Sequence, residues 1–165
     1  MKPFLLFDFD GTIADSIHLG TKIANRIAPL YGHKGFTDED FTRFRGMPVT
    51  KVIKELGVPF YKIPGVISKA LVEYRHLIHE LTPYPNIPQM LDTLSQMDVP
   101  MALLSSNSNE NLYYFLNNHR ITAFQWVEGT SGILKKHRRI LQQLKKHDLK
   151  PSDVIYVGDE VRDIV

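Results

Sequence analysis

The sequence predicts an α/β protein with a doubly wound, Rossmann-like parallel sheet into which a stretch of helices is inserted. Two observations indicate the sheet: short apolar runs alternate with amphipathic, helix-length segments over residues 87–157, and three apolar runs of the chain end in clusters of small polar and acidic residues. The inserted helices are indicated by residues 16–81, where apolar side chains recur at three- and four-residue steps.

The first elements follow from the spacing of the apolar residues. Residues 4–7 are a continuous apolar run that stops at a polar turn, which predicts a buried strand. A helical period covers residues 16–31, whereas residues 33–47 are polar and irregular and predict a loop. Residues 48–57 begin with proline and end with glycine, which is typical of a short helix, and residues 67–81 carry the clearest helical stripe.

A pair of prolines within residues 82–85 (TPYP) ends this helical stretch and marks a boundary. Beyond it, helices and strands alternate, as they do when crossover helices connect parallel strands. The expected elements are helices over 87–97, 109–119 and 136–147 and strands over 100–104, 124–127 and 154–157.

The composition excludes several classes of protein. The chain has 165 residues, of which 43% are hydrophobic and 23% charged, as in ordinary globular proteins. It has no cysteine, which excludes disulfides, cysteine–zinc sites and thiol catalysis and suits a reducing compartment. No apolar run approaches the ~18 residues of a membrane span, and Asp8 ends the first run too early for a signal peptide. We therefore expect a cytoplasmic protein without a membrane partner.

The net charge of +2 conceals one strongly basic segment. Residues 135–150 contain seven lysines and arginines and a single acid. Because Ile140, Leu141 and Leu144 give this segment an apolar side, it predicts a solvated amphipathic helix, and we expect no nucleic-acid partner.

Each of the three clearest strands runs directly into a polar cluster: DFDGT, SSNS and GDEVRD. The carboxyl ends of parallel strands lie at one edge of a sheet, which is where ligands bind in such folds. Four acids converge there: Asp8, Asp10, Asp159 and Asp163. Carboxylates at this density repel one another unless protons or a cation offset the charge. Oxygen ligands of this kind predict a hard divalent cation, Mg²⁺.

Four segments, in this order, resemble the motifs of the haloacid dehalogenase (HAD) superfamily. Asp8–Ser16 (DFDGTIADS) resembles the opening motif, and Leu103–Asn107 (LLSSN) resembles the second, a strand that ends in serine or threonine. Lys136 is similar to the lysine of the third motif, and Val157–Asp163 (VGDEVRD) to the fourth. Lys135, which stands where close relatives often have glycine, competes with Lys136 for the third role.

The resemblance implies a hydrolase that works through an aspartyl-phosphate. Asp8 is the implied nucleophile, and Asp10 is the implied general acid and base. An acid at the second of these positions is typical of the branches that act on phosphate esters rather than of the dehalogenases. The implied Mg²⁺ ligands are Asp8, the main-chain carbonyl of Asp10, Asp159 and Asp163. The implied phosphate-binding residues are Gly11, Thr12, Ser105, Ser106, Asn107 and Lys136.

The inserted helices resemble the cap of the phosphoglycolate phosphatase-like branch, which closes over the site and selects the leaving group. The resemblance implies a core domain of residues 1–14 and 83–165 and a helical cap domain of residues 15–82. Arg45 lies where this branch often carries a substrate-facing loop, and it would pair with a second anionic group such as a carboxylate. The implied activity is that of a Mg²⁺-dependent phosphatase acting on a small phosphorylated metabolite, such as phosphoglycolate or a sugar phosphate.

Two other functions fit the same residues. A phosphosugar mutase of the same superfamily would use the same nucleophile but would need a sugar bisphosphate to complete its cycle. A non-catalytic phosphate- or metal-binding module is the other alternative, because the sequence ends two residues after Asp163, where relatives continue through a further helix and strand. No motif specifies the oligomeric state.

Overall fold

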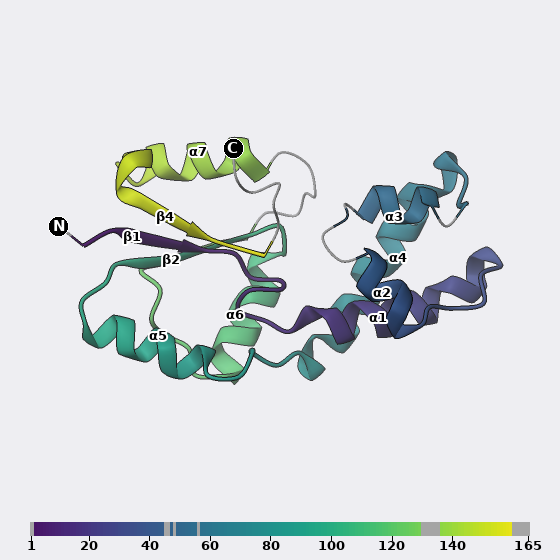
Figure 1. Ribbon diagram of the computed structural model, residues 1–165, viewed down its shortest axis with the longest axis horizontal. Helices are drawn as coiled ribbons and strands as arrows, with labels where there is room; N and C mark the ends of the chain where they lie inside the picture. The colour runs from purple at the N-terminus through teal and green to yellow at the C-terminus, as the bar shows by residue number, and fades with distance from the viewer. Residues whose placement is uncertain (1, 45–46, 48, 56, 130–135, 160–165) are drawn as a thin grey trace. The chain divides into compact units, whose positions relative to one another are not determined.

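The computed structural model describes residues 2–44, 47, 49–55, 57–129 and 136–159. The chain divides into two units (Figure 1). One is built from two distant segments, Met1–Asp15 and Thr82–Val165, and the other is the continuous segment Ser16–Leu81.

The first unit is organised around a sheet of four parallel strands in the order β3-β2-β1-β4. In the register, Phe7 pairs with Leu103 on one side and with Val157 on the other, so that the three strands end at nearly the same level. The predicted doubly wound parallel sheet is thereby confirmed. The strands are β1 (Phe4–Phe7), β2 (Met101–Ser105), β3 (Trp126–Gly129) and β4 (Val154–Val157).

Helices cover both faces of this sheet. Helix α7 (Lys136–Lys146) lies on one face, and α5 (Ile87–Gln96) and α6 (Asn109–Asn118) lie on the other (Figure 1). Because parallel crossovers are right-handed, helices that precede strands added in opposite directions from β1 must lie on opposite faces.

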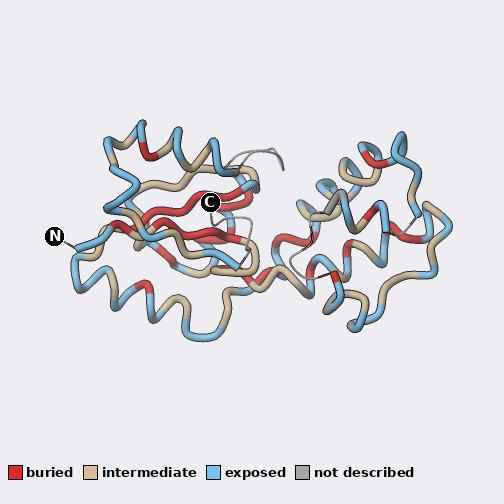
Figure 2. Tube along the Cα trace, turned by 45° about the horizontal axis from the view of Figure 1, so that its top comes forward, coloured by how far each residue is buried: buried red, intermediate tan, exposed pale blue. Residues whose placement is uncertain are grey.

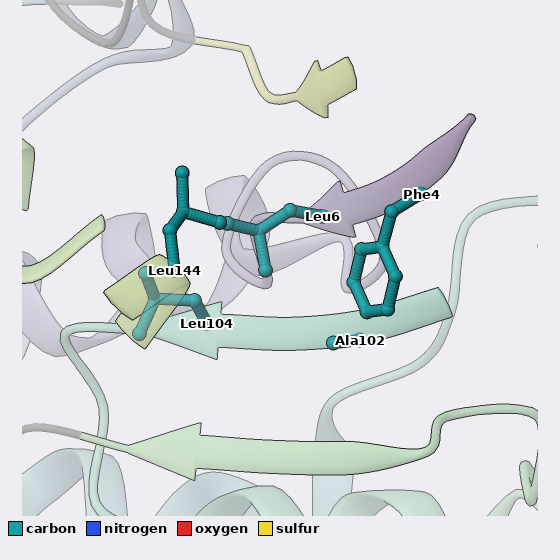
Figure 3. Close-up of a cluster of buried hydrophobic side chains, with 5 residues drawn as sticks. All are labelled: Phe4, Leu6, Ala102, Leu104 and Leu144. Atoms are coloured by element: carbon teal, nitrogen blue, oxygen red, sulfur yellow. The ribbon is translucent and has the colours of Figure 1, made fainter. Parts of the chain in front are cut away.

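The core follows from the alternation of side chains along the strands. On the α7 face, one cluster joins side chains of β1, β2 and α7 (Figure 3). On the other face, the buried ring of Phe9 packs edge-on against Phe115 of α6, with 4.9 Å between ring centroids. All five residues of β2 are buried, as expected of a strand covered on both sides. The cluster on the α7 face consists of Phe4, Leu6, Ala102, Leu104 and Leu144.

Every regular element described in the second unit is a helix. Buried side chains line one side of α1, and α1 packs against α4, so their facing sides form the interior of this unit (Figure 2). Two ion pairs reinforce the unit: Lys22 Nζ lies 2.5 Å from Glu80 Oε2, and Arg26 Nη1 lies 2.9 Å from Glu73 Oε2. Its helices are α1 (Ser16–Ile27), α2 (Asp38–Phe44), α3 (Val49–Glu55) and α4 (Ile63–Leu77), with one-turn 3₁₀ segments at Ala28–Tyr31, Phe60–Lys62 and Ile78–Glu80.

The prediction of a loop over residues 33–47 was wrong in part, because α2 occupies residues 38–44. A reciprocal cap starts this helix: the Thr37 amide donates to Asp40 Oδ2 at 3.0 Å, and the Asp40 amide donates to Thr37 Oγ1 at 3.3 Å. The helix α4 likewise begins four residues earlier than its apolar stripe indicated, with Pro64 in its first turn.

In the parts of the chain that the structure describes, no helix has both the length and the apolar character needed to cross a membrane.

Candidate active site

The candidate site lies where the winding of the sheet reverses direction. From β1 the chain adds β2 and β3 on one side and then returns to add β4 on the other. Ligands of open α/β sheets bind at such a switch point, beyond the carboxyl ends of the strands. Asp8 directly follows β1, and its amide donates to the Val157 carbonyl at 2.8 Å, which fixes the end of β1 against the end of β4.

A tight turn holds the first acidic loop. The Phe9 carbonyl accepts from the amides of residues 12, 13 and 14 at 3.3, 2.9 and 3.0 Å. Asp8 is 6% exposed, and its Oδ1 accepts the Phe9 amide at 2.8 Å. Asp10 is half-buried, and its main chain forms an isolated β-bridge with that of Ala14. The buried Phe9 ring, between these two carboxylates in sequence, anchors the loop against α6.

Gly11 is the point where the two acidic loops meet. Its φ of +75° is in the left-handed region, which strains any side chain. A Cβ at this position would lie 2.6 Å from Cγ of Asp159, so the carboxylate of Asp159 occupies the space that a side chain would need. The fold therefore brings Asp159 onto the loop that carries Asp8 and Asp10. Thr12 lies on the same loop, and its buried Oγ1 makes no hydrogen bond to any described residue.

The loop after β2 is held by its own polar side chains. Ser105 is 2% exposed, and its Oγ accepts the Asn107 amide at 3.0 Å. Asn107 Oδ1 accepts from the Ser108 amide at 2.9 Å and from Asn111 Nδ2 at 2.8 Å. Ser108 caps α6 by accepting the Asn111 amide at 3.3 Å, so the capping role does not fall to Ser105. Ser106, the remaining hydroxyl of the loop, is exposed.

Sequence reasoning missed two residues that hold this loop in place. Asn111 is 9% exposed and supports Asn107 from within α6. Gly129 pairs with Ser105 in the sheet, and a Cβ on it would lie 2.5 Å from the Asn109 nitrogen and 2.7 Å from the Asn107 carbonyl oxygen. A glycine two residues after the predicted strand over 124–127 was the available signal, because glycine often marks a close approach of backbones.

Three of the predicted residues lie outside the described ranges: Arg45, Lys135 and Asp163. Lys136 opens α7, but its side chain is likewise outside the description.

The donors at this edge fit a hard divalent cation. Two carboxylates, from Asp8 and Asp159, come from adjacent strands, and the Asp10 main chain adds a carbonyl oxygen to the same loop. No group of three or more His, Cys, Asp or Glu side chains suited to a metal occurs among the described residues. An ion held here would complete its shell with main-chain and water oxygens, and Mg²⁺ is the cation that usually keeps several waters.

Comparison with known proteins gives consistent matches over nearly the whole chain. The family model described as haloacid dehalogenase-like hydrolase matches residues 5–165. A phosphoglycolate phosphatase of Synechococcus elongatus is 28% identical over 161 residues, covering 97% of this chain and 76% of the relative. A phosphoglycolate phosphatase of Agrobacterium fabrum is 26% identical over 176 residues, covering 100% of this chain and 76% of the relative.

A solved structure has the same fold. The haloacid dehalogenase-like family protein from Streptococcus pneumoniae superimposes with a TM-score of 0.83 at 23% identity, covering 98% of this chain and 78% of that one.

The fold, the acidic strand ends and these matches define a hydrolase of the phosphatase class. More particularly, the chain belongs to the haloacid dehalogenase-like hydrolase family, and within it the chain resembles the phosphoglycolate phosphatases.

Proposed function

We propose that this protein is a Mg²⁺-dependent phosphatase that hydrolyses a small phosphate monoester through an aspartyl-phosphate on Asp8. One observation carries the proposal: the carboxylate of Asp159 lies against Gly11, in the loop that also carries the buried Asp8 and Asp10. Two carboxylates from adjacent strand ends thus share one edge of the sheet with Ser105.

In the first half of the reaction, a carboxylate oxygen of Asp8 attacks phosphorus, and the bond between phosphorus and the ester oxygen breaks. Asp10 gives its proton to the departing alkoxide, so an alcohol leaves. In the second half, Asp10 accepts a proton from a water molecule that attacks the phosphorus. The aspartyl–phosphorus bond breaks, and inorganic phosphate and the Asp8 carboxylate are restored. The turn around the Phe9 carbonyl supports these roles because it fixes the main chain of the loop that carries both residues.

Asp8, the Asp10 carbonyl and Asp159 would hold Mg²⁺, together with Asp163. The ion would offset the repulsion between an anionic nucleophile and an anionic substrate. Gly11, which has no side chain, lets the Asp159 carboxylate lie against the loop that would bind the phosphate, and Thr12 would offer a hydroxyl.

The remaining phosphate oxygens would be bound by the residues after β2 and by the lysine at the start of α7. Ser105, Ser106 and Asn107 offer hydroxyl and amide donors on a loop whose geometry is fixed by hydrogen bonds. Lys136 would add a positive charge. Donors that are already oriented stabilise the charge of the transition state without a reorganisation cost.

We assign residues 1–14 and 83–165 to the catalytic core domain and residues 15–82 to a helical cap domain that selects the substrate. The two compact units of the chain, which divide within a residue of these limits, support the assignment. For the substrate we propose phosphoglycolate, because two relatives are phosphoglycolate phosphatases. Arg45 would pair with its carboxylate.

Hydrolysis of p-nitrophenyl phosphate tests the mechanism. We expect turnover with Mg²⁺, none with excess EDTA, and a loss of at least about a thousandfold in kcat for Asp8→Asn. Asp98→Asn is the matched control, since Asp98 is exposed and has a φ of +51° that asparagine adopts readily. Turnover that survives in Asp8→Asn would refute the aspartyl-phosphate.

Product analysis tests the substrate and separates a phosphatase from a mutase. We expect release of inorganic phosphate from 2-phosphoglycolate, whereas migration of phosphate within a sugar phosphate would indicate the mutase. The Arg45→Gln substitution should raise KM for 2-phosphoglycolate and leave KM for p-nitrophenyl phosphate unchanged, because only the former has a carboxylate. Equal effects on both esters would remove Arg45 from the substrate site.

A further inference from the structure

The Ser16–Leu81 unit contains a pocket of its own. The pocket has a volume of about 410 Å³, within the ~300–1,000 Å³ of small-molecule sites. All of its lining residues belong to this unit, and none is a residue of the candidate active site. They are Leu30, Tyr31, Tyr61, Lys62, Gly65 and Lys69.

The lining is positively charged. Two lysines and no carboxylate line the pocket. Among the described residues, neither Lys62 nor Lys69 forms an ion pair, whereas Lys22 and Arg26 of the same unit are both paired with glutamates. An anionic group entering the pocket would therefore meet two cations whose charge is not already offset by a described partner.

The wall of the pocket is largely apolar and aromatic. Leu30 is 61% exposed and Tyr61 is 77% exposed. The neighbouring Phe60 is 88% exposed, so large apolar side chains gather in the Phe60–Lys62 segment. Large exposed apolar side chains gathered beside a pocket are typical of surfaces that a ligand covers. Tyrosine offers a flat face for a ring together with a hydroxyl for a polar group.

Gly65 keeps the pocket open. It lies in the first turn of α4, three residues after Lys62, which ends the preceding 3₁₀ segment, and four residues before Lys69 on the same side of the helix. A Cβ there would meet only the Tyr31 hydroxyl, at an ordinary 3.4 Å, and its φ is not in the left-handed region. Neither the backbone nor packing requires glycine, although glycine weakens a helix relative to alanine. What its missing side chain provides is space.

We propose that this pocket binds a small organic anion with a planar apolar body. Lys62 and Lys69 would hold the anionic group, and the flat body would cover Tyr61 and Leu30. This binding is separate from phosphate ester hydrolysis and does not depend on the function proposed above.

The test uses two fluorescent probes that differ in charge: 1-anilinonaphthalene-8-sulfonate, an aromatic anion, and N-phenyl-1-naphthylamine, its neutral analogue. Titrated into the full chain, the anion should bind saturably, and its binding should weaken as salt is raised. The double variant Lys62→Gln/Lys69→Gln should bind the anion at least about fivefold more weakly. It should leave binding of the neutral probe unchanged. The matched control is Lys51→Gln/Lys54→Gln on α3, which removes two exposed lysines outside the pocket.

A second variant separates a binding role from a structural one. Gly65→Ala should raise Tm through its helix propensity and at the same time weaken binding of the anion, because its methyl group enters the pocket. Gly20→Ala in α1, where a Cβ has no neighbour within 4 Å, should raise Tm without changing binding. Anion binding that is unchanged in both the lysine double variant and Gly65→Ala would overturn the proposal.

Discussion

Gly11 is the residue at which the main chain itself determines whether the candidate site can form. It combines a left-handed φ with a carboxylate in the place of its side chain. Gly32 has almost the same φ, +77°, but a Cβ on it would have no neighbour within 4 Å. Substitutions at Gly11 and at Gly32 therefore separate the effect of backbone strain from the effect of displacing the Asp159 carboxylate.

We predict that Gly11→Ala and Gly32→Ala each lower the free energy of unfolding by about 1–2 kcal/mol, the cost of a left-handed non-glycine residue. Only Gly11→Ala should also abolish phosphatase activity, because its methyl group displaces the Asp159 carboxylate. Chemical denaturation and p-nitrophenyl phosphate hydrolysis measure the two effects. Full activity in Gly11→Ala would mean that Asp159 does not need its present position.

For single residues, the sequence predicted the acidic and hydroxyl residues of the candidate site but not the residues that hold its loops in place. Asp8, Ser105 and Asp159 are visible because each lies at the end of an apolar strand or within two residues of it. Asn111 and Gly129 are not, because their roles depend on contacts between segments that meet only in the folded chain. An asparagine within a helix carries no local sign that it supports a loop of another element.

Among the elements, the junction between β3 and the start of α6 is packed too tightly for any side chain. The Gly129 amide donates to Asn109 Oδ1 at 2.5 Å, and main-chain atoms of residues 107–109 surround its Cα. Backbone atoms cannot rotate away as a side chain can. The loop that carries Ser105 is therefore held by β3 as well as by α6.

We predict that Gly129→Ala raises KM for phosphate esters severalfold and lowers Tm, because the methyl group must push the Ser105–Asn109 loop aside. Gly20→Ala, a glycine with open space around it, should leave KM unchanged and raise Tm slightly. Steady-state kinetics and thermal denaturation of both variants provide the measurement. An unchanged KM in Gly129→Ala would show that the loop position is not critical for binding.

The ion pair between Lys22 of α1 and Glu80, in the 3₁₀ segment after α4, makes the stability of the helical unit sensitive to acid. The hydrogen bond from Lys22 lowers the pKa of Glu80 below its ordinary value of 4.5. A carboxyl group with a lowered pKa in the folded state stabilises the fold above pH 4.5 and loses this contribution as the pH falls through its folded pKa.

Glu80→Gln should therefore lower Tm modestly at pH 7, and the difference from the wild-type protein should shrink below pH 4.5. High salt should shrink it as well, since the pair is on the surface. Thermal denaturation of both proteins over a range of pH and salt concentration measures the pH dependence and the salt dependence of this Tm difference. A Tm difference that grows in acid would contradict the assigned direction of the pKa shift.

The missed helix α2 illustrates why short elements are hard to predict. It has only seven residues, too few to display a helical period, and its cap is a Thr-x-x-Asp pattern rather than the commoner pairing with glutamate. The longer helices, which are long enough to display a helical period, were predicted to within a few residues at their ends.

For the whole molecule, alternation of strands and helices predicted a parallel sheet, but not the strand order. Nothing local to residues 154–157 indicates that β4 adds beside β1 rather than beyond β3. That choice depends on the face to which α7 packs through Leu144, a contact between distant segments. It creates the switch point on which the candidate site rests.

Metal binding should consequently stabilise the fold as a whole. With free Mg²⁺ at a hundred times its Kd, ligand linkage gives about 2.7 kcal/mol, and Tm should rise by several degrees. Asp159→Asn should lose most of this rise, while Asp153→Asn, an exposed control just before β4, should keep it. A rise of equal size in both variants would remove Asp159 from the metal site.

The pairing of β1 with β4 has a consequence for the folding of the chain while the ribosome synthesises it. Phe7 and its partner Val157 are far apart in the sequence, so β1 is synthesised long before β4. Until β4 emerges, one edge of β1 has no partner, and such an edge is a template for aggregation. Asp159 follows β4, so its carboxylate cannot reach Gly11 until synthesis has passed residue 159. The site proposed here can therefore form only after residues 8 to 159 have all been synthesised.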